Sequence, residues 1–389
     1  MRIAVYYDLA AGGAAFALGR FVEFLRSRHR VDVFAARGAV PIVSDTRFIG
    51  PAPRVFRAAL YYANRLSEPA RHLRLGRAEA RLAETLAPYD RVLVHSCRGR
   101  GAPALLSRLP GTRFYVTEPL RLYREPRPAE AAAPALWRAA RLAYAPVSTA
   151  LNRADRRHAR AATALFANST FTREEVRRVY GREARVAYPS VDPAWLGGDA
   201  GEGGGGYVLS PGALHPQKGH GRVLRALARL SNPPPLVAAG FAGRPGTRRR
   251  LAGLARDLGV TLRLVADPAR ETLMDLVRRA EVVALAPVRE PFGLVSVEAQ
   301  ALGRPVVAVN EGGLPETLLP GETDLLAPAD PERFAATLAA LLEDPARARR
   351  LGRAGRESVV ERFSPEARGE RLAALLEDNA PGGHAGTPQ

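Results

Sequence analysis

The sequence has one cysteine and no long apolar run, and each shortage excludes a class of protein. The single cysteine, Cys97, excludes a disulfide framework and a cysteine-based metal site. A membrane-spanning helix needs about 18 or more consecutive apolar residues, and the sequence has no such stretch. Asp8 interrupts the first apolar residues before a signal-peptide core forms, so we interpret this stretch as a strand. These features predict a two-domain cytoplasmic protein with ample core for its 389 residues.

Acidic residues are scarce in the first half of the chain. The formal net charge is +18, and residues 1–199 contribute +16 of it, with 33 basic and 17 acidic side chains. Such asymmetry predicts an anionic partner for the first half, either a lipid surface or nucleic acid. A general drift of composition toward arginine gives the same asymmetry. The first half has no aromatic residues interleaved on a basic groove and no known reader motif, so we do not expect a nucleic acid partner.

Lysine is the other shortage, because Lys218 is the only lysine in the chain. An ammonium and a planar guanidinium differ in shape and hydration, so a lone lysine among arginines marks a position where arginine does not serve. Lys218 lies in the motif LSPGALHPQKGH. We therefore predict a functional role for it, although its survival by chance is the simpler alternative.

Two glutamates stand eight positions apart between two apolar runs, residues 282–286 and 305–309, that are typical of buried parallel strands. Glu290 falls in the loop after the first strand, and Glu298 falls in the following helix. Ligands of open α/β sheets bind at this end of the strands. Carboxylates accept hydrogen bonds from hydroxyl groups, so the pair suits a ligand with hydroxyls on either side of a charged group, such as a nucleotide sugar. The alternative is a solvated loop residue and a helix-start glutamate.

The backbone amides of Phe292, Gly293 and Leu294 are predicted to form the N-terminus of the same helix. A helix N-terminus favours phosphate, and glycine permits its close approach. Further on, Asp330 and Pro331 are typical of the N-cap and first residue of another helix.

The stretch from Glu290 to Pro331 resembles the signature of the family 4 retaining glycosyltransferases, in which two glutamates are separated by seven residues. This resemblance implies the GT-B fold: two Rossmann-like, doubly wound α/β domains that face each other across a cleft. It also implies that Glu290 contacts the donor sugar and Glu298 the ribose. In place of the arginine that usually precedes the motif lysine by five residues, this chain has Ala213. Arg98, Arg121 and Arg244 are the candidates to replace that arginine.

The first half begins with a strand, a glycine pair and a helix, which is the start of a doubly wound domain. Gly12 and Gly13 resemble the family's glycine loop near donor and acceptor. His95 ends a predicted strand and is a candidate to act on an acceptor hydroxyl, a buried core histidine being the alternative. Glu118 and Arg121, in the stretch TEPLR, are candidates to orient acceptor or donor, and a structural ion pair gives the same pattern.

An arginine-rich helical pattern occupies residues 54–86. One interpretation is a basic amphipathic segment on anionic lipid at the inner face of the membrane. The other is a helix pair that packs on the sheet and exposes a solvated basic face. Pattern alone does not decide between them.

The expected domain order follows from composition and from the resemblance. Residues 1–195 form an acceptor-binding domain, and residues 207–365 form a nucleotide-sugar-binding domain. Between them, residues 196–206 are predicted to be a flexible linker, because residues 200–206 include five glycines. Residues 366–378 are expected to be a helix that returns to the first domain. Residues 379–389 are expected to be a disordered tail.

The predicted reaction is transfer of a hexose from a nucleotide-diphosphate sugar to the hydroxyl of a glycan, a lipid-linked or a small-molecule acceptor, with retention of configuration. Lys218 is expected to stabilise the diphosphate of the departing nucleotide. No cofactor or metal is expected, and the sequence contains no Asp-x-Asp pair. Two alternatives are a non-hydrolysing nucleotide-sugar epimerase and a catalytically silent relative that binds nucleotide sugars or anions.

Overall fold

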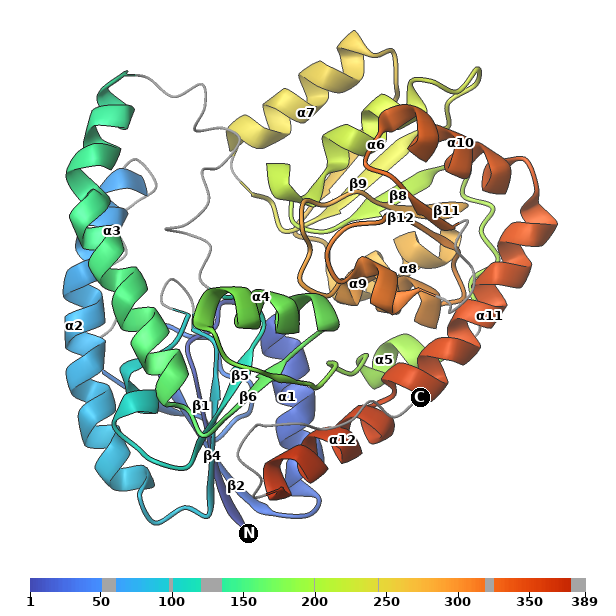
Figure 1. Ribbon diagram of the computed structural model, residues 1–389. Helices are drawn as coiled ribbons and strands as arrows, with labels where there is room; N and C mark the ends of the chain where they lie inside the picture. Colours follow the sequence, from blue (N-terminus) through green and yellow to red (C-terminus); the bar gives the residue numbers. More distant parts are fainter. Residues whose placement is uncertain are drawn as a thin grey trace. The chain divides into compact units, whose positions relative to one another are not determined.

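The chain forms two compact units, each built around one parallel β-sheet (Figure 1). The computed structural model describes residues 1–50, 61–97, 101–119, 135–198, 200–243, 245–318 and 325–378, with side chains for all of these except residues 61–71, 135–144 and 245. Unit 1 comprises Met1–Tyr188 and Gly369–Gln389, and unit 2 comprises Pro189–Arg368. None of the helices within the described ranges is long and apolar enough to cross a membrane.

The sheet of unit 1 has the strand order β3-β2-β1-β4-β5-β6-β7, and every neighbouring pair is parallel. Its central strands are mostly apolar, as is typical of a sheet covered on both faces. The strands are β1 (Arg2–Tyr7), β2 (Arg30–Ala36), β3 (Arg47–Ile49), β4 (Arg91–His95), β5 (Thr112–Val116), β6 (Ala164–Ala167) and β7 (Arg185–Val186).

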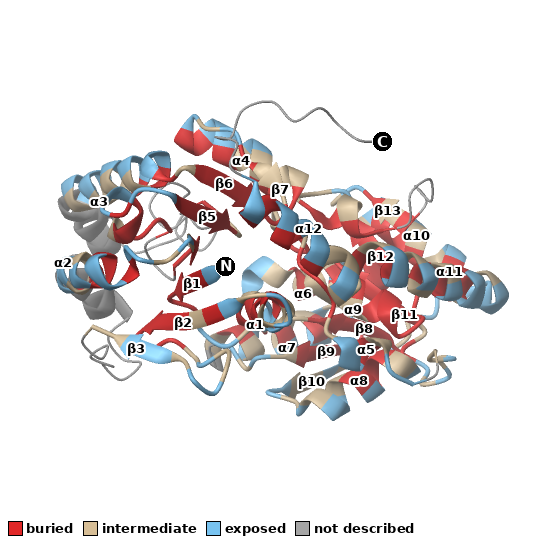
Figure 2. Ribbon diagram, turned by 90° about the horizontal axis from the view of Figure 1, so that it is seen from below, coloured by how far each residue is buried: buried red, intermediate tan, exposed pale blue. Residues whose placement is uncertain are grey.

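Helices cover both faces of this sheet, and the strands β1, β4, β5 and β6 between them are largely buried (Figures 1 and 2). One face packs against α2 (Tyr61–Leu86), η2 (Ala104–Ser107), α3 (Ala135–Ala161) and α4 (Thr170–Tyr180). The other face packs against α1 (Gly13–Arg26) and α12 (Pro365–Glu377). Although α12 follows unit 2 in the sequence, its Leu372 and Leu376 are buried in the core of unit 1 beside α1. The two helices pack closely because Gly369 has no side chain: a Cβ there would lie 2.2 Å from the ring of Phe24.

Unit 2 repeats the same design with the strand order β10-β9-β8-β11-β12-β13, again all parallel. The strands are β8 (Val208–Pro211), β9 (Leu236–Gly240), β10 (Leu262–Ala266), β11 (Val282–Leu285), β12 (Val306–Val309) and β13 (Leu326–Ala327). The helices are α5 (Pro193–Leu196), η4 (Pro216–Lys218), α6 (His220–Leu227), α7 (Pro245–Asp257), α8 (Arg270–Arg279), α9 (Leu294–Ala301), η5 (Leu314–Thr317), α10 (Pro331–Leu342) and α11 (Pro345–Phe363).

Both strand orders are those of a doubly wound sheet, so the predicted fold class of two Rossmann-like units is confirmed. The order reverses between β1 and β4 in unit 1 and between β8 and β11 in unit 2. Loops that leave neighbouring strands at such a point diverge to opposite faces, and a ligand can bind between them. The reversal therefore marks where each unit can hold a ligand.

The glycine-rich stretch of residues 200–206 differs from the sequence expectation of a flexible linker. It belongs to unit 2, because the units divide between Tyr188 and Pro189. The buried Arg304 donates to the carbonyl of Gly201 at 2.9 Å, and the Glu281 carboxylate accepts from the amides of Gly204 and Gly206, also at 2.9 Å. Glycine here allows close backbone packing instead of flexibility. The predicted disordered tail, residues 379–389, lies outside the described residues.

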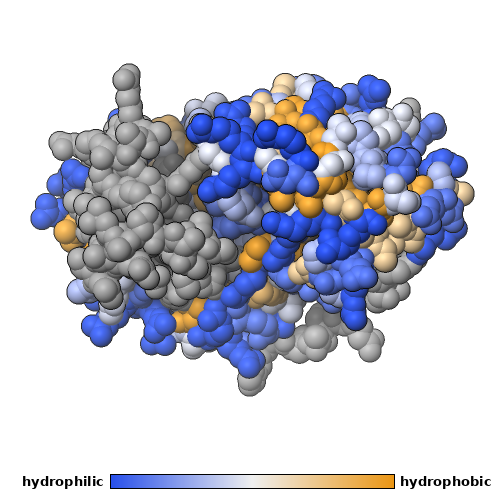
Figure 3. Space-filling model, turned by 90° about the horizontal axis from the view of Figure 1, so that it is seen from above, coloured by the Kyte–Doolittle hydropathy of each residue, from blue (hydrophilic) through white to orange (hydrophobic). Residues whose placement is uncertain are grey.

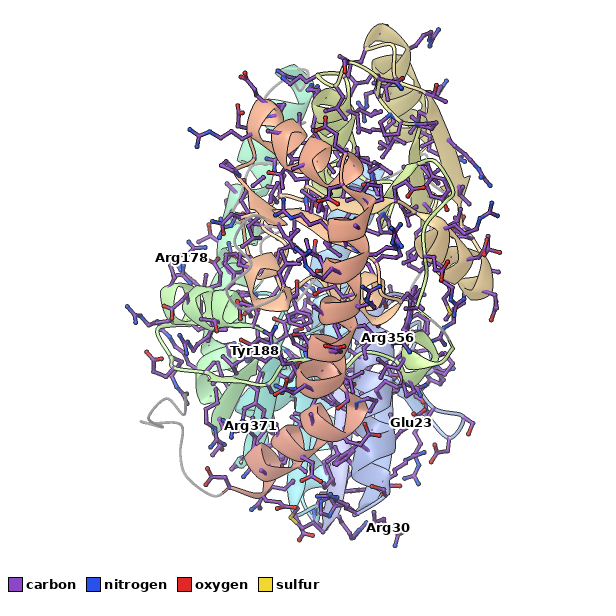
Figure 4. All side chains as sticks on the ribbon, turned by 90° about the vertical axis from the view of Figure 1, so that its right-hand side faces the viewer. Glu23, Arg30, Arg178, Tyr188, Arg356 and Arg371 are labelled. Carbon is purple, nitrogen blue, oxygen red and sulfur yellow. The ribbon has the colours of Figure 1, made fainter. Side chains whose placement is uncertain are left out.

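Two further features hold the helices of unit 2 in place. Asp330 caps α10 as predicted, since its Oδ1 accepts from the amides of Glu332 and Arg333 at 3.0 Å. Arg356, on α11, donates to the carbonyl of Ala301 at the end of α9 at 2.7 Å (Figure 4). The Arg356 bond fixes the end of α9, the helix on which Glu298 stands.

The described residues on the face shown in Figure 3 are mostly polar and charged, with apolar patches between the charged side chains. The large apolar side chains that stand exposed among the described residues are Met1, Phe16, Phe48, Leu73, Phe241 and Val360. Single exposed side chains of this kind are normal for a folded protein and indicate no docking surface by themselves.

Candidate active site

Lys218 and Glu290 meet at the reversal point of the unit 2 sheet. Lys218 ends η4, which follows β8, and Glu290 lies in the loop that follows β11. The Lys218 ammonium donates to both carboxylate oxygens of Glu290, at 3.0 and 2.8 Å, although the two residues are 72 positions apart. Their side chains remain 34% and 20% exposed, so water and ligands can reach the pair. The structure thus brings together two residues that the sequence analysis predicted to share a site at the strand ends.

The Lys218 loop is fixed against the end of β11 by its backbone. Gly219, with φ +76°, follows Lys218 directly, and a Cβ at this position would lie 1.7 Å from the carbonyl oxygen of Ala286. In addition, the Val288 amide donates to the Gln217 carbonyl at 2.9 Å. Because only glycine fits this approach, the motif around Lys218 brings the ammonium to the neighbouring strand.

The Glu290 loop is shaped by the glycine pair after β12. A Cβ on Gly312 would lie 2.3 Å from the Glu290 carbonyl oxygen, and the Gly313 amide donates to that same oxygen at 2.8 Å. Arg289, immediately before Glu290, has φ +50°, which is uncommon for a residue with a side chain. Such conformations persist only where the surroundings enforce them, and they cluster at functional sites.

His220 is a buried residue that the sequence analysis did not select, although it belongs to the Lys218 motif. Its Nε2 lies 3.1 Å from the carbonyl of Ala213, and its Nδ1 lies 2.8 Å from the hydroxyl of Ser210. A neutral ring with the proton on Nε2 satisfies both bonds, since Nε2–H donates to the carbonyl and Nδ1 accepts from the hydroxyl. Burial lowers the pKa of His220, which favours this neutral form. The histidine thereby fixes the loop that contains Ala213.

Ala213 offers no charge of its own, so the expected second cation must come from elsewhere. Arg98, Arg121 and Arg244, the three sequence candidates, lie outside the described residues. Arg222, which the sequence analysis did not consider, stands on α6 one turn beyond Lys218. Its guanidinium donates to the Pro287 carbonyl at 3.3 Å and lies 3.7 Å from the Glu311 carboxylate.

Glu298 has an environment different from that of Glu290. It lies within α9 as predicted and is largely surrounded by protein, and this burial raises its pKa from 4.5 to about 8. The nearby ion pair between Arg270 and Asp192, at 2.7 Å, has opposing effects on that pKa, which Arg270 lowers and Asp192 raises. At neutral pH Glu298 is therefore mostly protonated and can both donate and accept a hydrogen bond. Arg270 and Asp192 had no sequence signal, because their proximity to Glu298 is a product of folding.

The N-terminus of α9 forms where it was predicted. Gly293 is the N-cap, with φ +102°, and Leu294 is the first helical residue. A Cβ on Gly293 would lie 2.5 Å from a methyl carbon of Leu314, so glycine is required here. The side chain of Phe292 is buried and packs edge-to-face on Phe363, with ring centroids 5.7 Å apart. Phe292 thus anchors the start of the helix through its side chain.

At the reversal point of unit 1, Gly12 and His95 follow the two diverging strands. Gly12 is the N-cap of α1, with φ +151°, and a Cβ there would meet no atom within 4 Å. His95 ends β4, is 1% exposed and has its Nδ1 2.9 Å from the carbonyl of Ser96. Burial lowers its pKa to about 4, so the ring is neutral at neutral pH. This is the environment of a buried core histidine, the alternative that the sequence left open.

The predicted acceptor residues after β5 are only partly described. Glu118 is partly buried directly after Thr117, whose hydroxyl lies 2.7 Å from that of Ser96. This hydroxyl pair links the ends of β4 and β5 and was not anticipated from the sequence. Arg121 lies outside the described residues. Within the described part of the chain, no three His, Cys, Asp or Glu side chains gather closely enough to hold a metal ion.

Solved structures with similar folds identify the class of architecture. Sucrose-phosphate synthase from Thermosynechococcus elongatus superposes with a TM-score of 0.69 at 22% identity, covering 96% of this chain and 98% of that one. Anabaena Alr3699/HepE, solved in complex with UDP and glucose, gives 0.71 at 19% identity, covering 97% and 99%. At these identities the likeness establishes the fold, which is that of the two-domain GT-B proteins.

Sequence comparison then gives the family. The glycosyl transferase 4-like domain matches residues 12–190, and the glycosyl transferases group 1 domain matches residues 201–358. The chain therefore belongs to the group 1 glycosyltransferases, the family 4 group that its signature residues resemble.

Relatives of known name match only part of the chain. D-inositol 3-phosphate glycosyltransferase of Corynebacterium efficiens is 38% identical over 180 residues, which are 44% of this chain and 42% of that protein. The enzyme of the same name from Mycolicibacterium vanbaalenii is 41% identical over 153 residues, covering 36% and 34%. In both cases the match spans less than half of the relative's length.

Proposed function

We propose that the protein transfers a hexose from a nucleotide-diphosphate sugar to an acceptor hydroxyl and retains the configuration at the anomeric carbon. The observation that supports this most directly is the contact between Lys218 and Glu290 at 2.8 Å. It brings a cation suited to a diphosphate and a carboxylate suited to sugar hydroxyls together at the end of two strands. Membership in a glycosyltransferase family and the UDP and glucose bound to a protein of the same fold support the same donor class.

The donor is proposed to bind along unit 2. Lys218 neutralises the diphosphate, together with the backbone amides of Phe292, Gly293 and Leu294 at the start of α9. Glu290 accepts hydrogen bonds from the hexose, and Glu298 binds the ribose hydroxyls.

The ribose role of Glu298 has its own test. Glu298→Gln should weaken binding of the nucleotide more than it slows the transfer step, because the ribose is remote from the reacting carbon. Calorimetry of nucleotide binding measures the first effect, and turnover at saturating donor measures the second. Equal affinity in wild type and variant would remove Glu298 from the ribose site.

The acceptor is proposed to bind to unit 1, near the glycine loop of Gly12 and Gly13. His95, Glu118 and Arg121 are the residues of this unit proposed to orient the acceptor hydroxyl. A neutral His95 that donates from Nδ1 to the Ser96 carbonyl keeps a lone pair on Nε2, which can accept a hydrogen bond.

In the proposed reaction the acceptor oxygen bonds to the anomeric carbon while the bond from that carbon to the phosphate oxygen breaks. Attack on the same face of the sugar retains the configuration, and the leaving phosphate oxygen takes the acceptor's proton. No carboxylate is assigned as a nucleophile. Positive charge at the diphosphate lowers the barrier, because negative charge develops there in the transition state. No metal ion is proposed, and unchanged turnover in a strong chelator is the corresponding test.

The experiment is a donor screen followed by product analysis. Thermal shift with a panel of nucleotide sugars identifies the donor, since a ligand at a hundred times its Kd stabilises the folded state by about 2.7 kcal/mol. The selected donor is then incubated with and without candidate acceptors, and the anomeric configuration of the product is read by NMR. Transfer that depends on an acceptor and retains configuration supports the proposal. Epimer or free sugar formed equally fast without any acceptor would contradict it.

We also propose a cytoplasmic location in which the basic first half meets an anionic membrane surface at its inner face. The net charge of +16 over residues 1–199 supports this. Flotation with vesicles that contain phosphatidylglycerol should decrease as salt rises. If the protein does not float with these vesicles at low salt, the membrane proposal is wrong.

A further inference from the structure

Unit 1 contains a cavity that the proposed reaction does not use. It lies on the flank of the sheet, between α2, the edge strand β3 and its neighbour β2, and has a volume of about 550 Å³. This size is within the range of small-molecule sites. We call it the arginine groove; its principal residues are Phe34, Arg47, Arg74, Arg77, Arg81 and Leu82.

The arginines of the groove reach it from one face of a helix and from one strand. Arg74, Arg77 and Arg81 recur at helical spacing on α2, so their side chains share one face. Arg47 joins them from β3, where it forms an ion pair with Asp32 at 3.0 Å and lies over the Phe34 ring at 5.5 Å. Beneath the charges, Phe34 and Leu82 are buried and provide an apolar floor.

The three helix arginines are exposed and have no ion-pair or hydrogen-bond partner for their guanidinium groups among the described residues. The acid within the same stretch, Glu79, cannot serve them, because it is buried and accepts from the Tyr6 hydroxyl and the Ala104 amide at 2.8 Å each. Like charges at this spacing repel one another. The exposed Glu84 of the same helix forms no ion pair with the three arginines in the part of the chain that the structure describes, so a bound anion would relieve that repulsion.

We propose that the arginine groove binds a small organic phosphate monoester that also has an apolar part. Guanidinium groups match tetrahedral phosphate oxygens with paired N–H donors, and they suit this role better than ammonium groups. The apolar floor between the arginines fits a short alkyl or ring group. An open groove of this size accommodates a small molecule that contacts both the arginines and the apolar floor.

The groove is separate from the donor residues proposed above. Within unit 1 it borders the edge strand β3, whereas Gly12 and His95 follow β1 and β4, where the strand order reverses. Lys218, Glu290 and Glu298 all belong to unit 2. The proposal therefore adds a second anion site and does not depend on the glycosyl transfer proposed for the protein.

The test measures binding of n-octyl phosphate, below its critical micelle concentration, to the full chain by calorimetry. Inorganic phosphate and n-butyl phosphate serve as shorter probes. The groove variant replaces Arg74, Arg77 and Arg81 by glutamine. Its matched control replaces Arg153, Arg156 and Arg157, three exposed arginines of α3 in the same unit, and so removes the same charge.

We expect octyl phosphate to bind at least tenfold more tightly than butyl phosphate, because added methylene groups are buried on the floor. We expect the groove variant to weaken octyl phosphate binding at least tenfold and the control to leave it within twofold. Replacing the three groove arginines by lysine should restore binding only in part, since lysine keeps the charge but loses the planar fork.

Three results would overturn the proposal. One is an equal loss of binding in the groove and control variants, which would indicate a general charge effect. Another is an equal affinity for inorganic phosphate and octyl phosphate, which would show that the apolar floor does not contribute to binding. The third is binding to phosphatidylglycerol vesicles, lost in the groove variant, without any binding of octyl phosphate, which would assign the arginines to a membrane surface.

Discussion

The two reversal points, one in each unit, have the same topology and very different chemistry. In unit 2, the loops after β8 and β11 meet through a partly exposed ion pair of Lys218 and Glu290. In unit 1, β4 at the reversal point ends at His95, which is buried and neutral, and the hydroxyls of Ser96 and Thr117 connect this strand end to β5. The comparison shows that topology selects where a site can form. The residues at the strand ends decide whether it carries charge.

The difference extends to two titratable groups whose pKa values are shifted by burial. The pKa of Glu298 in unit 2 is raised to about 8, so its carboxyl group is mostly protonated below that pH. The pKa of His95 in unit 1 is lowered to about 4, so its ring is mostly neutral above that pH. Burial disfavours the charged form in both, so the acid is shifted up and the base down. Near neutral pH both groups are mostly uncharged, which leaves the Lys218–Glu290 pair as the charged feature of these strand-end residues.

Lys218→Ala gives the largest expected effect and tests whether charge in unit 2 is what the reaction needs. Turnover should fall about a hundredfold, or about 3 kcal/mol, because one preorganised cation at the diphosphate is lost. Steady-state kinetics measures this, and circular dichroism checks the fold. Arg353→Ala, which removes an exposed cation from α11, is the control and should retain wild-type turnover. Unchanged turnover in Lys218→Ala would exclude Lys218 from the mechanism.

Gly219→Ala should have the next largest effect, a loss of stability, because it disrupts the backbone packing that brings the unit 2 loops together. The added Cβ would lie 1.7 Å from the Ala286 oxygen, so the free energy of unfolding should fall by about 2 kcal/mol or more. Urea unfolding measures this. In Gly253→Ala, on α7, the added Cβ meets no atom within 4 Å, and stability should rise by up to about 1 kcal/mol. Equal midpoints for the two variants would contradict the packing argument.

Glu298→Gln tests the pH dependence in unit 2. The carboxyl group loses its proton near pH 4.5 in the unfolded chain and near pH 8 in the folded one, so the folded state binds more protons between these values. The contribution of Glu298 to the free energy of unfolding therefore falls as pH rises through that range, by at most about 1.4 kcal/mol per pH unit. In Glu298→Gln the free energy of unfolding should decrease less between pH 5 and pH 8 than in wild type, as measured by urea unfolding. Glu357→Gln, on the exposed face of α11, controls for the loss of a carboxyl group. A decline as steep as in wild type would place Glu298 in a more polar environment.

His95→Asn tests the opposite pH dependence in unit 1 and should have the smallest effect. His95 takes up a proton near pH 6.5 in the unfolded chain and near pH 4 in the folded chain. Its contribution to the free energy of unfolding therefore falls as pH decreases from 6.5 to 4. The asparagine side chain cannot be protonated in this range, and the variant should lose less stability than wild type between pH 6.5 and 5. At pH 7.5, turnover should fall much less than in Lys218→Ala. A larger fall would establish His95 as an essential acceptor residue and would erase the contrast between the two reversal points.

Much of this organisation could be predicted from the sequence. Apolar runs bounded by glycine and capping residues place the strands and helices, because local periodicity and backbone preference determine them. Glu290 in a loop and Glu298 in the next helix are positions of this kind, as are Asp330 at its helix N-cap and Lys218 in its motif. The expectation of a flexible linker at residues 200–206 failed, because composition does not reveal that Glu281 and Arg304 bind that stretch.

By itself, then, the sequence determined the order of elements, the family signature and the residue types available for chemistry, since each depends on neighbours along the chain. Only the tertiary structure decided that Lys218 contacts Glu290, that Glu298 is partly buried near Arg270 and Asp192, and that His95 is buried and neutral. It also formed the arginine groove from a helix face and an edge strand. These outcomes depend on burial and on contacts between distant residues, which local pattern does not specify.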